Sequence, residues 1–438
     1  MRRFVFSFLI GLAFLAPNAA SSQIGAPHGP ISDSQWLRVG GDMAAALRSR
    51  PRERLRIVDQ GGAPSAMVQL GRLAFRAPQV LGGLARRDGM SCQTCHTNGH
   101  VASGFFIEAL SDRPGNVDVS HFLFNPRADD RLANPLNIPS LRGIAATAPY
   151  GHDGRFGTLE DFTRNVIVNE FQGERPQGWL LDALVAYMRQ LEFLPGPTLT
   201  PSGRLTADAP AAARRGEAVF HRPFANAPAL SCAACHPPTQ AFADGRPHDV
   251  GTGGLFSTPS LLNVGVSAPF FHDGRASDLA AVVGHFDAQF ELGLDDAEIA
   301  DLVAYLDVVG AASDPETPVT LATDLDDVGA FLTLFDFAID DEDAPLAAFL
   351  APAVRHQVGL IHERFTGEGN ADVRSRLVGW SRDIAAVGRL VEAGEAPAAR
   401  ERLAALRLRM RDDRPTLEAA AANSLYDPAN LAAAFAGR

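Results

Sequence analysis

Two five-residue units carry the chemistry that this sequence indicates, Cys92-Gln93-Thr94-Cys95-His96 and Cys232-Ala233-Ala234-Cys235-His236. In a C-x-x-C-H unit two thiols form thioethers with one porphyrin, and the adjacent imidazole ligates its iron, so the motif predicts a c-type haem. A disulfide, a zinc site and a thioredoxin-like pair are the alternatives, but neither unit has further cysteines nearby to complete an all-cysteine zinc site. We therefore predict two covalently bound haem c groups. The attachment residues would be Cys92, Cys95, Cys232 and Cys235, and the proximal iron ligands His96 and His236.

Length, composition and the first residues describe the setting of these units. A chain of 438 residues with 46% hydrophobic and 21% charged residues is long enough for two or three globular domains. Arg2, Arg3, an apolar run to Leu15 and small residues up to Ser22 form a secretory signal peptide, with an uncleaved anchor as the alternative. We expect a periplasmic protein without a transmembrane segment after cleavage. A net charge of −12 argues against a nucleic-acid partner.

A repeated block follows each haem unit. The first copy reads Pro-Ser-Leu at 139–141 and Ala-Pro-Tyr-Gly-His-Asp-Gly-Arg at 148–155, and residues 259–261 and 268–275 repeat this pattern with the same offset. Each block runs into an amphipathic helix, so the chain carries a duplicated haem domain. A Pro- and Gly-rich breaker at 194–201 separates the copies.

We expect a mainly α fold with two tandem cytochrome-c-like haem domains and a helical C-terminal extension. The extension is rich in Ala, Leu and Arg, predicts four or five helices and carries no chemical motif, so a helical cap or a platform for a partner is the most that the sequence indicates. The predicted boundaries are 1–22 for the signal peptide, 23–198 and 199–312 for the haem domains, and 313–438 for the extension.

The duplicated C-x-x-C-H, P-S-L and A-P-[YF]-x-H-D-G-R blocks resemble those of the bacterial di-haem cytochrome c peroxidases. They are also similar to those of the related methylamine-utilisation di-haem enzymes, which oxidise a protein tryptophan. The resemblance covers roughly residues 70–310. It implies that one haem accepts electrons from a small cytochrome c or cupredoxin and that the other binds and cleaves hydrogen peroxide.

The sequence departs from that family at one iron ligand. By resemblance, the distal Met of the second haem falls on Phe286, and Met is absent from residue 189 to residue 409. Losing a thioether ligand lowers the redox potential or leaves the iron open. Phe286 also completes an apolar helical stripe, which favours core packing. Neighbouring His285 could reach the iron if the helix were rotated.

Further histidines are candidates for the distal face of each haem. His248 lies in a Gly-rich loop of the second copy, with a surface role as its alternative, and spacing does not decide between His100 and His121 in the first. His152 and His272 occupy the same position in both repeats. Hydrogen bonding to a propionate or to backbone is their alternative to a catalytic or ligating role.

The resemblance also implies a proton-handling group and a calcium ion. Glu170 falls near the family's distal Glu, which would protonate the departing oxygen of peroxide, although a solvated helix end is the simpler interpretation. Asn137 and the backbone of Ser267 and Pro269 fall on the ligand positions of a calcium ion between the domains.

Three functions follow from these residues. The leading hypothesis is a periplasmic di-haem oxidoreductase of peroxidase type, which reduces hydrogen peroxide with electrons from a small redox protein. The alternatives are a di-haem oxidase that acts on a protein or a small organic substrate, and a pure electron-transfer cytochrome. The sequence also leaves a homodimer open.

Overall fold

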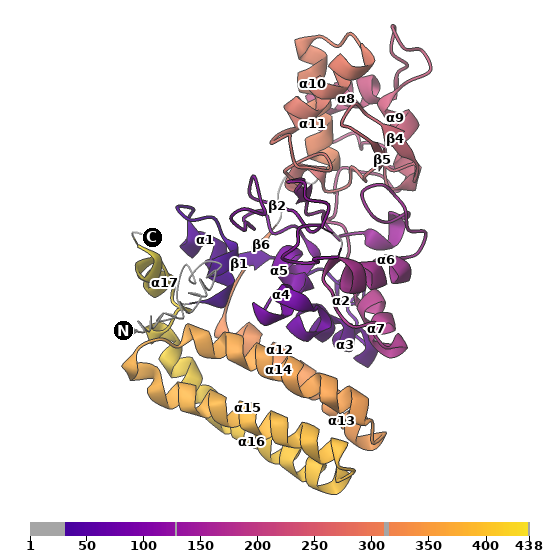
Figure 1. Ribbon diagram of the computed structural model, residues 1–438. Coiled ribbons are helices and arrows are strands. Elements are labelled where there is room, and N and C mark those ends of the chain that lie inside the picture. Colours follow the sequence, from indigo (N-terminus) through magenta and orange to yellow (C-terminus); the bar gives the residue numbers. More distant parts are fainter. Residues whose placement is uncertain (1–30, 128, 311–314, 437–438) are drawn as a thin grey trace, which may run out of the picture.

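The computed structural model describes residues 31–127, 129–310 and 315–436, and this part of the chain is mainly helical (Figure 1). The mainly α fold is therefore confirmed. The signal peptide expected at residues 1–22 lies outside the described residues. Within them, every helix is too short or too polar to cross a lipid bilayer.

The first repeat is built on two helices in close contact, α3 (Ala66–Phe75) and α7 (Gly178–Met188). A Cβ added at Gly71 of α3 would lie 1.8 Å from the carbonyl oxygen of Ala183, so only glycine allows this approach. Shorter elements complete the repeat: α1 (Met43–Arg48), α2 (Arg56–Asp59), α4 (Gly83–Arg87), α5 (Cys92–Cys95), α6 (Leu159–Asn165) and the π-helical turn η5 (Val166–Glu170).

The second repeat has the same construction. Helices α8 (Ala211–His221) and α11 (Asp296–Val309) meet at Gly216, where a Cβ would lie 1.9 Å from the carbonyl oxygen of Asp301. The haem unit forms α9 (Cys232–Cys235), and α10 (Leu279–Phe290) follows the repeated block. The duplication therefore extends to α3 and α8, which precede the haem units in the sequence.

Three short antiparallel ribbons supplement the helices. Strand β1 (Ser49–Pro51) pairs with β6 (Glu316–Pro318), which joins the N-terminal part of the first repeat to the start of the extension. The other two ribbons lie within the repeats: β2 (Asn116–Val117) with β3 (Leu136–Asn137), and β4 (Pro247–Asp249) with β5 (Leu255–Ser257).

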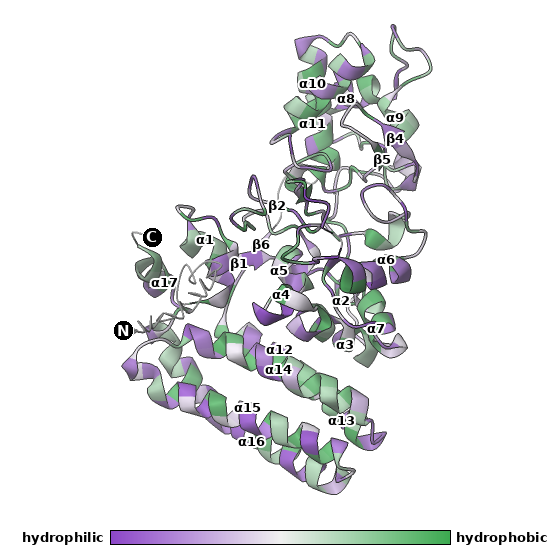
Figure 2. Cartoon of the chain, viewed as in Figure 1, coloured by the Kyte–Doolittle hydropathy of each residue, from purple (hydrophilic) through white to green (hydrophobic). Residues whose placement is uncertain are grey.

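The extension forms helices packed against the first repeat, as Figure 1 shows in orange to yellow. Apolar and polar residues alternate along these helices (Figure 2), which is typical of amphipathic packing. Phe331 and Phe335 of the extension belong to the same buried cluster as Leu73 and Leu184 of the first repeat, whereas the second repeat has its own core around Phe220. The extension comprises α12 (Leu321–Leu332), α13 (Leu334–Asp340), α14 (Ala344–Arg364), α15 (Ala371–Glu392), α16 (Ala396–Ala420) and α17 (Pro428–Phe435).

The two repeats meet through reciprocal backbone hydrogen bonds. The amide of Asn137 donates to the carbonyl of His272 at 2.8 Å, and the amide of Ser257 donates to the carbonyl of His152, also at 2.8 Å. Because Asn137 and Ser257 precede the two P-S-L blocks by the same number of residues, equivalent segments exchange equivalent bonds.

The longer loop of the first repeat adds side-chain donors to this junction. Arg113 Nη1 donates to the carbonyl of Gly274 at 2.9 Å, and Asn116 Nδ2 donates to the carbonyl of Asp273 at 3.2 Å. Both acceptors lie in the H-D-G-R turn of the second repeat. The extra residues between His96 and Pro139 thus fasten one repeat to the other.

The glycine contact between α3 and α7 gives a stability prediction. Gly71→Ala should destabilise the fold by about 1–3 kcal/mol or more, because the new methyl group overlaps a backbone carbonyl that cannot move alone. Gly329→Ala on α12 is the control, since a Cβ there meets nothing within 4 Å, and it should stabilise by about 0.5–1 kcal/mol. Thermal unfolding followed by circular dichroism measures both; equal Tm values would contradict the described contact.

Candidate functional site

Each C-x-x-C-H unit folds as one helical turn. In α5, Ser91 and Thr94 form a reciprocal capping box that starts the turn directly before Cys92. Residues three apart lie on the same side of a helix, so both thiols of a unit face one direction, as attachment to one porphyrin requires. None of the four cysteines forms a disulfide. Burial raises the pKa of Cys92, Cys95 and Cys232 to about 12, so these side chains are thiols rather than thiolates at neutral pH.

The two histidines that end the units present the same ring nitrogen. His96 Nδ1 lies 2.9 Å from the carbonyl oxygen of Pro139, and His236 Nδ1 lies 2.8 Å from that of Phe242. An Nδ1–H donated to a carbonyl leaves the lone pair on Nε2, which is the form of imidazole that ligates iron. Burial lowers the pKa of His96 to about 4 and also lowers that of His236, so both rings are neutral at pH 7. The residues present therefore fit a haem c at each unit.

The second repeat adds an acceptor to the repeat pattern. The carbonyl of Pro259, the counterpart of Pro139, interacts with His236, and the carbonyl of Phe242 lies 2.8 Å from His236 Nδ1. Ala241 and Phe242 have φ values of 53° and 57°, in the left-handed region that side chains other than glycine rarely adopt. This strained pair aims the Phe242 carbonyl at the imidazole. Sequence reasoning missed Phe242, because no local pattern marks it.

The structure separates the two histidine candidates of the first repeat. His100 is buried, and its Nδ1 lies 3.2 Å from Ser140 Oγ, next to the Pro139 carbonyl that holds His96. His121 lies in the loop whose Asn125 side chain donates to the carbonyl of Asn169 in the π-helical turn η5. The loop of His121 and the turn of Glu170 are thus brought together.

This second group packs around the first haem unit. Cys95 contacts the same apolar cluster as Leu123, which follows His121, and Phe171, which follows Glu170. Gln172 Nε2 also donates to the carbonyl of Phe124, which holds the loop against the turn. The segments of His121 and Glu170 therefore share an apolar cluster with Cys95 of the first haem unit.

Glu170 has a mostly buried side chain, 22% exposed, at the end of the π-helical turn. Burial raises the pKa of the Glu170 carboxyl, although Arg155 at 3.6 Å and a hydrogen bond from Asn165 at 3.1 Å oppose the rise. Arg155 is the last residue of the repeated A-P-x-x-H-D-G-R block, so the repeat motif supplies the only cation that ion-pairs with Glu170 within the described residues. A π-helical turn is a frequent feature of functional sites.

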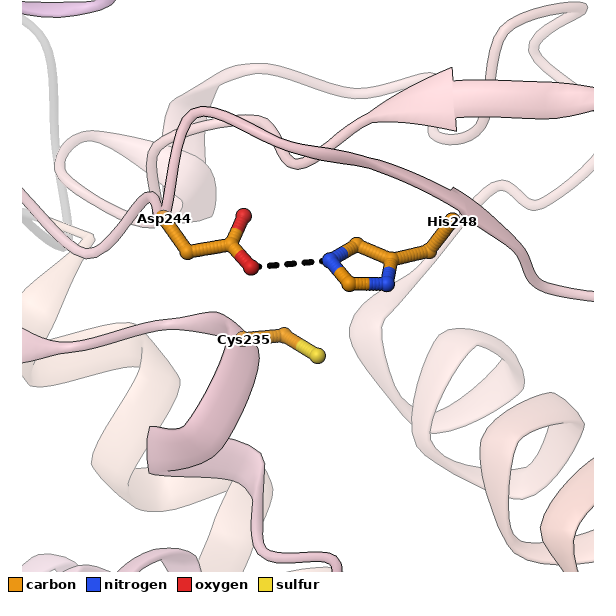
Figure 3. A group of neighbouring side chains, drawn as sticks. All are labelled: Cys235, Asp244 and His248. Atoms are coloured by element: carbon orange, nitrogen blue, oxygen red, sulfur yellow. Dashed lines mark hydrogen bonds and ion pairs between the residues drawn. The ribbon is translucent and has the colours of Figure 1, made fainter.

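In the second repeat, His248 lies beside the haem unit (Figure 3). Its Nε2 is 2.8 Å from Asp244 Oδ2, and Cys235, Asp244 and His248 place one ligand atom each within 4.8 Å of one another. Because Cys235 is an expected haem-attachment thiol, this trio is part of the second haem site rather than a separate metal centre. Asp244, four residues before His248, is a second residue that sequence reasoning missed.

The position of the expected Met is occupied by an aromatic cluster. Phe286 stacks on Phe271 and Phe290, with ring centroids 6.1 Å apart in both cases. His285 packs edge-on against Phe271, and its Nε2 lies 2.8 Å from the carbonyl oxygen of Val250. His285 and the loop that carries His248 are therefore linked by a direct hydrogen bond.

His152, His272 and Asn137 meet at the junction of the repeats. His152 Nε2 is 3.0 Å from the carbonyl oxygen of Asn137, and the His272 ring stacks on Phe256 with centroids 3.9 Å apart. Asn137 Nδ2 donates to the carbonyl of Pro269 at 2.8 Å, but its Oδ1 is buried without a partner among the described residues. Ser267, the remaining calcium candidate, donates its hydroxyl to the carbonyl of Asn263.

Comparison with known proteins gives three main findings. The sequence profile of the family described as di-haem cytochrome c peroxidase matches residues 210–314. The gamma subunit of hydrazine synthase from Kuenenia stuttgartiensis is 28% identical over 239 residues, which are 41% of this chain and 65% of that protein. The methylamine utilization protein MauG of Methylorubrum extorquens is 26% identical over 294 residues, 56% of this chain and 78% of that protein.

Among solved structures, Kuenenia stuttgartiensis hydrazine synthase aligns with a TM-score of 0.42 and 20% identity, covering 70% of this chain and 99% of that chain. The sequence match to the hydrazine synthase subunit spans less than two thirds of that relative's length. The resemblance inferred from the repeated motifs is confirmed: residues 210–314 match the di-haem cytochrome c peroxidase family, and the chain is similar to two methylamine utilization proteins MauG.

Proposed function

We propose that the chain is a periplasmic di-haem oxidoreductase of peroxidase type, which reduces hydrogen peroxide with electrons from a small cytochrome c or cupredoxin. The observation that carries the proposal is the difference between the two haem sites. Both present an Nε2 atom for iron, but only the first has, within the described residues, a buried carboxyl group with a raised pKa beside its haem unit.

Bound haem c supplies one-electron redox chemistry and an iron face to which peroxide can bind. Reduction of peroxide to two waters takes up two electrons and two protons, and the departing oxygen must be protonated. The raised pKa lets the Glu170 carboxyl hold a proton that it can donate, and Arg155 then stabilises the carboxylate that remains. His121, on the adjacent loop, is the side chain that we assign to the distal face of the first haem.

The second site suits electron transfer rather than peroxide cleavage. Phe271, Phe286 and Phe290 form an apolar surface without a carboxyl group, and His285 and His248 are both hydrogen-bonded to other groups. These bonds occupy Nε2 of both histidines, so either one would ligate iron through Nδ1 or after exchanging that bond. We propose that this haem receives electrons and passes them across the junction where His152 and Asn137 meet.

A second candidate is a di-haem oxidase that acts on a protein or a small organic substrate. The match to MauG, which extends over 56% of the chain, favours it. Turnover separates the two: a peroxidase oxidises a reduced small cytochrome or cupredoxin in the presence of peroxide, whereas an oxidase consumes peroxide only with its organic or protein substrate. A protein in which both haems are low-spin and bind neither peroxide nor cyanide would be an electron carrier alone.

Replacing one proximal ligand should affect one haem. In His96→Ala the first haem loses its imidazole and in His236→Ala the second does, so each variant should change one set of absorption and EPR signals and leave the other set native. The two variants are controls for each other. Equal loss of both sets in either variant would contradict two separate haem sites.

Glu170→Gln should lower peroxide turnover by about 10²–10⁴-fold, because the amide cannot donate the required proton. Since the pKa of Glu170 is raised, the protonated form persists above the usual range of a Glu, and turnover should fall as pH rises through that raised pKa. This limb of the pH profile should vanish in the variant. The exposed Glu174→Gln, four residues away, is the matched control. Native turnover in Glu170→Gln would exclude this role.

A calcium ion at the junction is a further part of the proposal. The buried Oδ1 of Asn137 has no hydrogen-bond partner among the residues that the structure describes, and carbonyl and amide oxygens are ligands that calcium prefers. Adding calcium to protein treated with a chelator should raise its Tm, and Asn137→Ala should remove most of this gain. Asn134→Ala, at an exposed position of the same loop, is the control. A Tm that is independent of calcium would disprove the site.

A further inference from the structure

Four charged side chains from distant parts of the sequence meet where the extension contacts the first repeat. Arg72 of α3 donates to both carboxylate oxygens of Asp327 on α12, at 2.7 and 3.1 Å, and its Nε donates to Glu53 at 2.7 Å. Arg76, one turn further along α3, donates to Asp327 at 2.7 Å. The four side chains are between 7% and 18% exposed, so solvent and salt screen them weakly.

Arg76 connects this cluster to the first haem unit. Its Nη2 donates to Oδ1 of Asn98 at 3.3 Å, and Asn98 is the second residue after His96. The same Oδ1 accepts from Nε2 of Gln93 at 2.9 Å, and Gln93 Oε1 accepts from the Asn98 amide at 3.1 Å. Gln93 lies between the two attachment cysteines. A chain of hydrogen bonds thus runs from Asp327 through Arg76 to the loop that follows His96.

The charges of the cluster balance. Burial would raise the pKa values of Glu53 and Asp327, but Arg72 and Arg76 outweigh burial and hold both pKa values below the ordinary range. Two carboxylates therefore face two guanidinium groups at neutral pH. Loss of either kind of charge would leave an uncompensated charge inside the protein, close to the loop after His96.

The second repeat provides an internal comparison. The glycine contacts and the ring pairs Phe75–Tyr187 and Phe220–Tyr305 align α3 with α8. Of the polar network, only the tyrosine is shared between the aligned positions of the two copies. The second repeat has Glu217 at the position of Arg72 and His221 at that of Arg76. It has Ala233 in place of Gln93 and Pro238 in place of Asn98, while Tyr305 matches Tyr187.

The aligned side chains of the second repeat also lack a counterpart of Asp327, the carboxylate that the extension supplies to the first repeat. Tyr305 Oη and His221 Nε2 are buried without a hydrogen-bond partner among the described residues. By contrast, Tyr187 Oη donates to Glu53 at 2.7 Å. Within the part of the chain that the structure describes, no acid of the extension forms an ion pair with α8. Across the described ranges, the network is therefore found only at the first haem site, where the extension packs against the first repeat.

We propose that Asp327 is a positioning residue for the first haem: the C-terminal extension uses it to hold the loop after His96 and to lower the redox potential of that haem relative to the second. A buried carboxylate stabilises the more positive, oxidised iron, so removing its charge should raise the potential. The proposal rests on the assignment of one haem to each C-x-x-C-H unit, but it does not depend on peroxide turnover.

The experiment is a redox titration of the haem-loaded, full-length protein, followed by absorption and EPR. In Asp327→Asn, the potential of the haem whose signal His96→Ala removes should shift upward, while the other haem keeps its native potential. Arg72→Gln removes a cation from the same cluster, so it should shift the same haem downward. Asp327→Glu retains the charge and should restore a potential close to native.

The matched control is Asp326→Asn, which removes the same charge from the neighbouring residue of α12. Asp326 is 67% exposed and pairs with Arg414 of the extension at 2.8 Å, so its loss should move neither potential. Native potentials in both Asp327→Asn and Arg72→Gln, or equal shifts of both haems, would overturn the proposal. If a variant fails to load, loss of the first haem alone supports the positioning role, and joint loss of both haems contradicts it. If these shifts are observed but the protein has no peroxidase activity, the proposed function is refuted and this inference still holds.

Discussion

A metal-ligating histidine almost always donates its other ring N–H to a partner, and in this chain backbone carbonyls are the partners of both imidazoles. Pro139 supplies the carbonyl for His96, and Phe242 supplies it for His236. In each repeat, the C-x-x-C-H turn must place two thiols beside the imidazole. A following loop must also bring a backbone carbonyl to Nδ1 of that imidazole. The glycine contacts between α3 and α7, and between α8 and α11, hold two helices of each repeat in close contact, and these loops lie between those helices in the sequence.

The two repeats share this pair of closely packed helices and differ in the segments around them. The first repeat carries a longer loop, whose Arg113 and Asn116 bind carbonyl groups of the second, and a π-helical turn that ends in a buried carboxyl group. In the second repeat, Phe271, Phe286 and Phe290 stack on one another in the helix that follows the repeated block and in the block itself. The two repeats therefore share one scaffold and differ in the segments around it.

The sequence was sufficient for features that depend on local spacing. The haem units, the repeated blocks and the helical extension are short-range patterns, and the mainly α fold and the family resemblance were confirmed. The partners of the site residues could not be predicted, because they come from distant positions. Asp327 pairs with Arg72 across 255 residues, and Phe242 reaches His236 only through two residues in the left-handed region. The contrast between His100 and His121 likewise depends on which loop contacts the π-helical turn, and no spacing rule contains that information.

The shared core of the first repeat and the extension has a consequence for the order of maturation. Helix α3 cannot bury its apolar and charged face until α12 and α14 are present, although more than two hundred residues separate them in the chain. The second repeat has a core of its own and lies between these partners. During synthesis, the second repeat can therefore complete its fold first, while the first repeat folds fully only when the end of the chain is present. The N-terminal haem site is thus the last part of the molecule to be finished.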